Sequence, residues 1–237
     1  MMNLNREERL AAMRKLSADC ERFWALEEVK SWSVPDLIDG FLRSTDSTMS
    51  EREILSCFAI STDRHLGWSG LCQVYEYIVA SDPASDGNHA TYATWISIGA
   101  ATMKDGEGVS LEERVRVAAD VEAIVERAAR ETGFCPETTL GYFYYDHPLK
   151  SEQPQLYLLK SKEWFERLIE SEDGEITDHH DLQYLGHVHF ELGDFKTALQ
   201  WYSKLETAEN QCADGCVLDR SLAETRLAEC QRRLADS

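Results

Sequence analysis

The fold of this chain is decided by residues 182–205, which read LQYLGHVHFELGDFKTALQWYSKL. Apolar side chains recur here at helical spacing on both sides of Gly193-Asp194, which predicts two helices joined by a tight turn. Gly186 has no side chain, so a second helix can approach the first closely at this position. Ala198 and Tyr202 lie one turn apart on the second helix and are expected to face back across the pair. The stretch therefore predicts a helical hairpin.

The spacing resembles the signature of the tetratricopeptide repeat, a helix-turn-helix unit of about 34 residues. The shared features are a Leu-Gly pair at Leu185-Gly186, a Gly-Asp-Phe turn at residues 193–195, and a small residue followed four positions later by an aromatic one. The resemblance covers the segment Asp178–Ala208. It implies an all-α fold in which antiparallel helical hairpins stack into an α-solenoid.

A second, more divergent copy of the pattern lies upstream. A small residue, an aromatic residue and a leucine occur at a spacing of four and then three in two places, 37 residues apart: Ser161, Phe165 and Leu168, and Ala198, Tyr202 and Leu205. Leu140-Gly141 similarly precedes Leu185-Gly186 by 45 residues. The two offsets agree if about eight extra residues occupy the intervening turn. We therefore predict a second hairpin before the first.

A further helix is predicted at the end of the chain, over Cys216–Leu234. Its leucines are expected to face inward: Leu218, Leu222, Leu227 and Leu234. The opposite side is charged, which suits the terminal cap that a helical stack needs for solubility. We expect residues 134–237 to hold the repeats and this capping helix.

Residues 1–133 are predicted to form a helical N-terminal half. Divergent helical hairpins are one arrangement that its helix lengths allow. Ser50 followed by Glu53, and Ser110 followed by Glu113, match the capping box that opens a helix. A turn is expected around Asp63–Gly70. Persuasive alternation of apolar and polar residues is missing from the whole sequence, so all-α is the predicted fold class.

Composition limits the classes of partner. The 237 residues are 43% hydrophobic and carry a formal net charge of -19, as expected for a folded acidic protein. Such a charge repels phosphate backbones, which argues against nucleic-acid binding. A protein or peptide, in particular a basic one, is the electrostatically favoured partner. Self-association into a homo-oligomer also stays open.

The cysteines indicate the cellular compartment of the protein. They are odd in number and form no disulfide framework: Cys20, Cys57, Cys72, Cys135, Cys212, Cys216 and Cys230. This pattern favours reduced thiols and a cytoplasmic location. The first residues are acidic and lack the apolar stretch of a signal peptide. The longest uncharged stretch, Gly87–Met103, is too short and too polar to span a bilayer, so we expect no membrane association.

The resemblance also implies a binding site. In tetratricopeptide stacks the first helices line a concave groove that binds extended peptides. The residues that correspond to this face are His180, Gln183, His187, Phe190 and Glu191. Relatives that hold a peptide carboxylate use Lys, Arg and Asn here, whereas a Glu favours a basic or mixed ligand. We therefore expect a non-enzymatic protein-binding module, such as an adaptor or a dedicated chaperone.

A rival hypothesis comes from a histidine cluster. Four histidines and two aspartates occur in the segment Asp178–His189, and a helical metal-dependent hydrolase could draw ligands from such a set. Zinc ligands on one helix are commonly four residues apart, and no histidine pair has this spacing. Nucleotide-binding and hydrolase motifs are also missing. The favoured expectation is that the chain has no catalytic residue, no cofactor and no metal.

Overall fold

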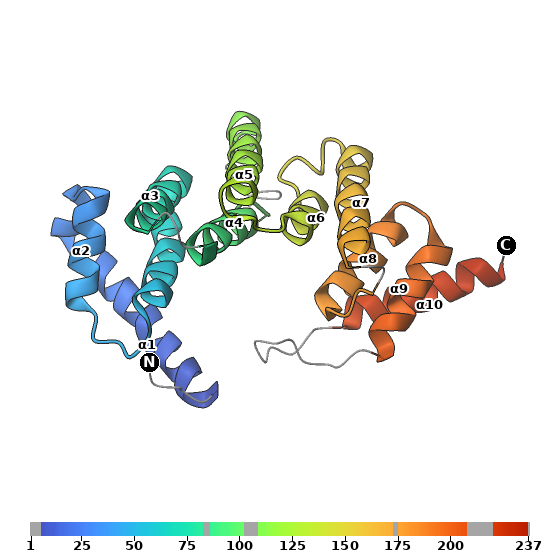
Figure 1. Ribbon diagram of the computed structural model, residues 1–237, viewed down its shortest axis with the longest axis horizontal. Helices are drawn as coiled ribbons and strands as arrows, with labels where there is room; N and C mark the ends of the chain where they lie inside the picture. Colours follow the sequence, from blue (N-terminus) through green and yellow to red (C-terminus); the bar gives the residue numbers. More distant parts are fainter. Residues whose placement is uncertain (1–5, 83–85, 102–108, 173–174, 208–219, 237) are drawn as a thin grey trace. The chain divides into compact units, whose positions relative to one another are not determined.

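The computed structural model describes residues 6–82, 86–101, 109–172, 175–207 and 220–236 (Figure 1). Every regular element within these ranges is a helix, which confirms the all-α class. None of the described helices combines the length and the apolar character that a membrane span requires. Cys212, Cys216 and Leu218 lie outside the described residues, so the predictions made for them stay predictions.

The chain divides into two compact units. The first comprises residues 1–96 with 130–134, and the second comprises residues 97–129 with 135–237. Most of α5 (Leu111–Thr132) thus belongs to the second unit, whereas the sequence pattern puts a boundary after residue 133. Long-range contacts account for this, because Arg114 of α5 donates a hydrogen bond to the carbonyl of Pro148 (2.9 Å) and pairs with Glu152 (2.5 Å).

The first unit is a set of helices around an aromatic core. It contains α1 (Arg6–Trp24), the 3-10 helix η1 (Glu27–Ser31), α2 (Val34–Ser44), α3 (Glu51–Ser81) and most of α4 (Asp86–Ala101). The Phe58 ring of α3 stacks on Trp24 of α1 and on Phe41 of α2, at centroid distances of 5.4 and 4.6 Å. These rings hold the first three α-helices of the unit together.

Both predicted capping boxes lie at helix starts. At the start of α3, the Ser50 hydroxyl accepts from the Glu53 amide (3.4 Å) while the Glu53 carboxylate accepts from the Ser50 amide (3.0 Å). At the start of α5, the Ser110 hydroxyl accepts from the Glu113 amide (3.1 Å). The turn expected around residues 63–70 is a kink within α3, where Gly67 has φ 66° and ψ −169°.

The second unit contains most of α5, together with α6 (Glu137–Tyr145), α7 (Pro154–Ser171), α8 (His179–Glu191), α9 (Phe195–Thr207) and α10 (Ser221–Ala235). α6 packs on α7 and α8 packs on α9, while α8 also contacts α6, α7 and α10 (Figure 1). One apolar core runs through α6–α10, with Phe165, Leu185 and Tyr202 among its buried members. α8 therefore lies between its neighbours in the unit.

The two helix pairs close in the same way. A Cβ atom at Gly186 would lie 2.3 Å from Cε1 of Tyr202, and one at Gly141 would lie 2.8 Å from Cζ of Phe165. In each pair, a glycine of the first helix thus receives the aromatic ring of the second. The turn between α8 and α9 uses Gly193 at φ 80°, a backbone conformation that favours glycine.

The inward face of α10 differs from the prediction. Leu227 is buried as expected, but Leu222 and Leu234 are 48% and 39% exposed. Ala223 and Cys230 are buried in their place. Residues 223, 227 and 230 follow the four-then-three spacing of one helix face, whereas Leu222 and Leu227 are five apart and diverge around the axis.

Candidate functional site

The candidate site lies along α8, which begins at a strong N-cap. The Asp178 carboxylate accepts hydrogen bonds from the amides of His180 (2.8 Å) and Asp181 (3.2 Å). These bonds satisfy backbone donors that the first turn leaves without helical partners. We use the name α8 row for the predicted groove residues on this helix: His180, Gln183, His187, Phe190 and Glu191.

The first two residues of the α8 row are partly exposed. The side chain of His180 lies near the Asp178 carboxylate (3.8 Å), and its ring contacts the ring of His179. Burial and the neighbouring His179 lower the pKa of His180, so this ring is predominantly neutral at pH 7. The Gln183 amide lies 3.3 Å from Nε2 of His187. His180 and Gln183 thus present polar groups at the N-terminal end of the row.

His187 is buried, with 4% of its surface exposed. Its Nδ1 atom is hydrogen bonded to the hydroxyl of Tyr202 on α9, at 2.7 Å. Burial and the nearby Arg226 lower the pKa of His187 to about 4, which keeps the imidazole neutral at pH 7. The contact explains how an imidazole is accommodated in the core. His187 therefore holds α8 against α9 and does not present its side chain at the surface.

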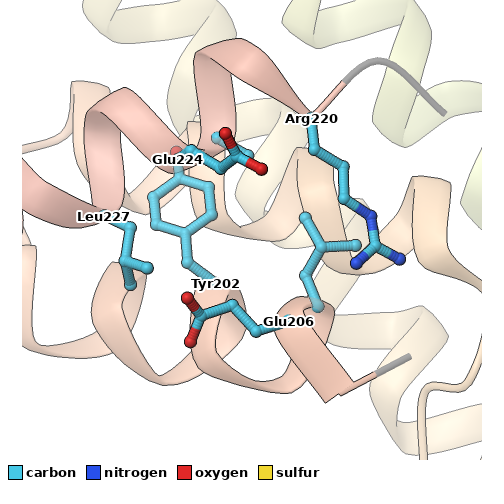
Figure 2. A pocket seen from close by; sticks show the side chains of 7 residues that line it. Tyr202, Glu206, Arg220, Glu224 and Leu227 are labelled. Atoms are coloured by element: carbon cyan, nitrogen blue, oxygen red, sulfur yellow. The ribbon is translucent and has the colours of Figure 1, made fainter. Parts of the chain in front are cut away.

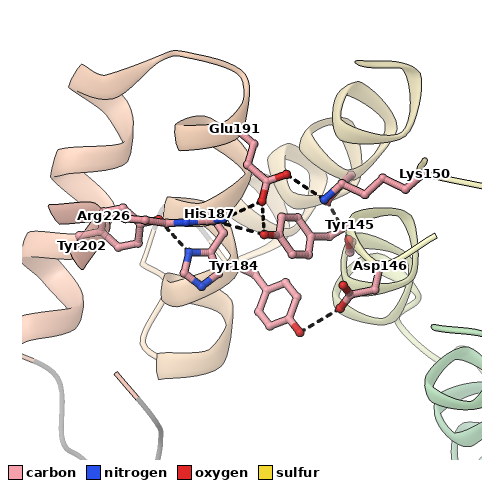
Figure 3. Close-up of polar contacts among 10 residues, drawn as sticks. Tyr145, Asp146, Lys150, Tyr184, His187, Glu191, Tyr202 and Arg226 are labelled. Carbon is pink, nitrogen blue, oxygen red and sulfur yellow. Dashed lines mark hydrogen bonds and ion pairs between the residues drawn. The ribbon is translucent and has the colours of Figure 1, made fainter. Parts of the chain in front are cut away.

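Glu191 lies at the centre of an ion-pair network (Figure 3). Its carboxylate accepts hydrogen bonds from Lys150 (2.8 Å), from Arg226 of α10 (2.9 Å) and from the Tyr145 hydroxyl of α6. Burial alone would raise the pKa of Glu191, but the bonds from Lys150 and Tyr145 outweigh it, and the pKa is lowered. The network joins α6, α8 and α10 through one carboxylate.

Phe190 lies at the edge of the core, partly buried. Its ring makes an edge-to-face contact with Phe195, at a centroid distance of 5.5 Å. The Arg226 guanidinium lies over the same ring, 5.0 Å from the centroid. Arg226 therefore contacts both Phe190 and Glu191, which orients the C-terminal end of the α8 row.

A second set of polar contacts joins α6 to α8. The Tyr142 hydroxyl donates to Asp181 (2.6 Å), and the Tyr184 hydroxyl donates to Asp146 (3.2 Å; Figure 3). Burial raises the pKa of Asp181 to about 6, although the bond from Tyr142 opposes the shift. The sequence shows an aromatic run at residues 142–145, which we interpret as packing. The hydroxyl partners of Tyr142, Tyr144 and Tyr145 are 39, 22 and 46 residues away, so they leave no local signal.

The histidine cluster is dispersed around α8. His189 is buried and lies 3.2 Å from the Asp194 carboxylate, whereas Asp178 caps the helix. Within the described ranges, no three His, Cys, Asp or Glu side chains converge as a metal site would need. The metal-dependent hydrolase hypothesis thus gains no geometric support from these residues.

A cavity of about 260 Å³ lies between α9 and α10 (Figure 2). Its apolar wall comprises Tyr202, Leu205, Ala223 and Leu227, and its charged side chains are Glu206, Arg220 and Glu224. Tyr202 lines this cavity, and its hydroxyl is bonded to His187. No motif or spacing in the sequence singles out these charged residues.

Comparison with known proteins finds no match among family models, curated proteins or solved structures.

Proposed function

We propose that the second unit is a non-enzymatic protein-binding module, and that the exposed part of the α8 row contacts the partner. The observation that carries this proposal is the position of α8. It contacts α6 and α10 on either side, and His180, Gln183 and Phe190 of the row are only partly buried. In the tetratricopeptide arrangement that the sequence resembles, such first helices line the groove.

The glycine-aromatic contacts support the same proposal. Gly141 with Phe165, and Gly186 with Tyr202, close two successive helix pairs in equivalent ways. Helical-repeat proteins that bind peptides are built from successive equivalent hairpins. The proposed role is that of an adaptor or dedicated chaperone in the cytoplasm, working without a cofactor.

The contacts of the α8 row suggest what the partner must supply. The part of the Phe190 ring that Phe195 and Arg226 leave exposed offers an apolar surface, while His180 and Gln183 offer groups for hydrogen bonds. Glu191 selects less strongly for a basic ligand than the sequence suggests, because Lys150 and Arg226 already neutralise it. The preference for a basic or mixed partner rests on the net charge of -19.

The test compares two double variants in affinity capture from a lysate of the source organism. His180→Ala with Gln183→Ala alters the exposed end of the α8 row without truncating the buried His187. Lys196→Ala with Gln200→Ala alters exposed positions of α9 and serves as the matched control. Circular dichroism and thermal melting establish that each variant folds.

A partner captured by the wild type is then purified and its affinity measured. We expect the α8 variant to bind about tenfold or more weakly, because two truncated central contacts at about 1 kcal/mol each exceed the roughly 1.4 kcal/mol that corresponds to a factor of ten. The α9 control should bind like the wild type. Equal affinity of all three proteins would remove the α8 row from the binding site.

A further inference from the structure

In the first unit, one hydrogen bond and two ring contacts fix how α1 lies against α3. Trp24 Nε1 donates to the Ser61 hydroxyl at 3.0 Å. The Trp24 ring also stacks on Phe58, at 5.4 Å and 4°, and on His65, at 4.8 Å and 15°. Trp24 therefore lies beside the stretch of α3 between residues 58 and 65.

Cys20 and Cys57 each lie one helical turn before the residues of that hydrogen bond. Cys20 precedes Trp24 by four positions, and Cys57 precedes Ser61 by four. Lys15 of α1 likewise pairs with Asp46, just before the start of α3. The Cys20 and Cys57 thiols are close enough for each to affect the pKa of the other. Residues later in α1 thus contact residues later in α3, so the two helices are parallel here. This register brings the two cysteines face to face.

The two thiols are chemically distinct. Cys20 is 1% exposed, whereas Cys57 is only partly buried and within reach of a small solute. The hydrogen bond from Cys20 lowers the pKa of Cys57. The same contact, together with burial, raises the pKa of Cys20. Cys57 is therefore the thiol that ionises first, and the thiolate is the reactive form.

We propose that Cys20 and Cys57 form a dithiol site that a peroxide oxidises to an intramolecular disulfide between α1 and α3. The Cys57 thiolate attacks one peroxide oxygen, so that an S–O bond forms, the O–O bond breaks, and hydroxide leaves and is protonated to water. The Cys20 sulfur then attacks the Cys57 sulfenic sulfur, so that the S–S bond forms and the S–O bond breaks.

The hydroxyl of the Cys57 sulfenic acid leaves with the Cys20 proton as the second water, so atoms and electrons balance. Two thiols lose two electrons and two protons, and one peroxide becomes two waters. The resulting disulfide closes the segment between residues 20 and 57, which contains α2. By restricting the unfolded chain, the cross-link should raise the melting temperature of the first unit.

The experiment treats the folded full-length chain with hydrogen peroxide, alkylates the remaining thiols and digests it with trypsin without reduction. Cleavage after Lys and Arg releases residues 16–22 and residues 53–64, each containing one cysteine, Cys20 or Cys57. We expect these peptides to be linked about tenfold or more often than any other pair among the five cysteines that the structure describes, because unaligned cysteines need backbone movement to bridge. Oxidation should remove about 2 Da from the chain.

The main control repeats the oxidation in guanidinium chloride, where the preference should disappear because the register is lost. Cys57→Ser should abolish the link, whereas Cys135→Ser, at an exposed cysteine, should leave it unchanged. If the native and denatured chains give the same distribution of links, the proposal is wrong. This comparison uses only the wild type, so it decides the matter even if Cys57→Ser fails to fold.

Discussion

Gly186 of α8 lies directly against the ring of Tyr202 on α9, so that a Cβ at this position would lie 2.3 Å from Cε1. The hydroxyl of the same tyrosine is bonded to His187, the next residue of α8. One aromatic side chain therefore fixes both the distance and the register between the two helices. The α8 row depends on this contact for its orientation.

Gly186→Ala is expected to destabilise the second unit. In an uncrowded helix, replacing glycine by alanine stabilises by roughly 0.5–1 kcal/mol, because alanine loses less backbone entropy. Here the added methyl meets the ring of a fully buried tyrosine, and overpacking of this kind costs about 1–3 kcal/mol. Urea unfolding of the variant and of the exposed control Ser203→Ala measures the difference. A more stable Gly186→Ala protein would contradict the close contact.

Glu191→Gln should destabilise the protein at neutral pH by about 1–3 kcal/mol, because it leaves two partly buried cations without their carboxylate. The pKa of Glu191 is lowered in the folded state, so its stabilising effect is present above the unfolded pKa. The effect is lost as pH falls through the lower folded pKa, in a window below the ordinary glutamate pKa of 4.5. The melting temperatures of the two proteins should therefore converge as the pH is lowered from roughly 7 to roughly 3. A constant difference would contradict the network.

Asp181→Asn should stabilise the protein at neutral pH, which is the opposite effect to that of Glu191→Gln. The pKa of Asp181 is raised to about 6, so the protonated carboxyl is favoured in the folded state. Its contribution is fully present below the unfolded pKa and is lost as pH rises through about 6. Asparagine stays neutral and can still accept the bond from Tyr142. We expect the variant to melt at a higher temperature than the wild type at pH 7 and at a similar one near pH 3.5. A less stable variant at pH 7 would contradict this assignment.

The sequence was most informative where one residue type has one local task. Ser50 and Ser110 identify helix starts because their hydroxyls cap backbone amides within the next three residues. Gly186 with Tyr202 identifies a hairpin because a close helix approach needs a missing side chain. Such signals depend on short-range geometry, so helix class and pairing could be predicted.

The candidate site was less predictable because its contacts are remote in sequence. Lys150 and Arg226 reach Glu191 from 41 and 35 positions away, and no pattern within α8 indicates them. His187 occupies a groove position by resemblance, yet the Tyr202 hydroxyl provides the partner that lets it stay buried. The predicted inward face of α10 is wrong at Leu222, because Leu222 is five positions from the buried Leu227 and lies on a different side of the helix.

The most direct test of the binding proposal is site-specific photo-crosslinking to the captured partner. Benzoylphenylalanine replaces His180 in the α8 row in one protein and exposed Gln200 of α9 in another. Irradiation of each complex is followed by mass spectrometry of the cross-linked product. The account predicts a covalent product from position 180 and little or none from position 200. Cross-linking from position 200 with none from position 180 would contradict it, because the partner would then contact another face of the second unit.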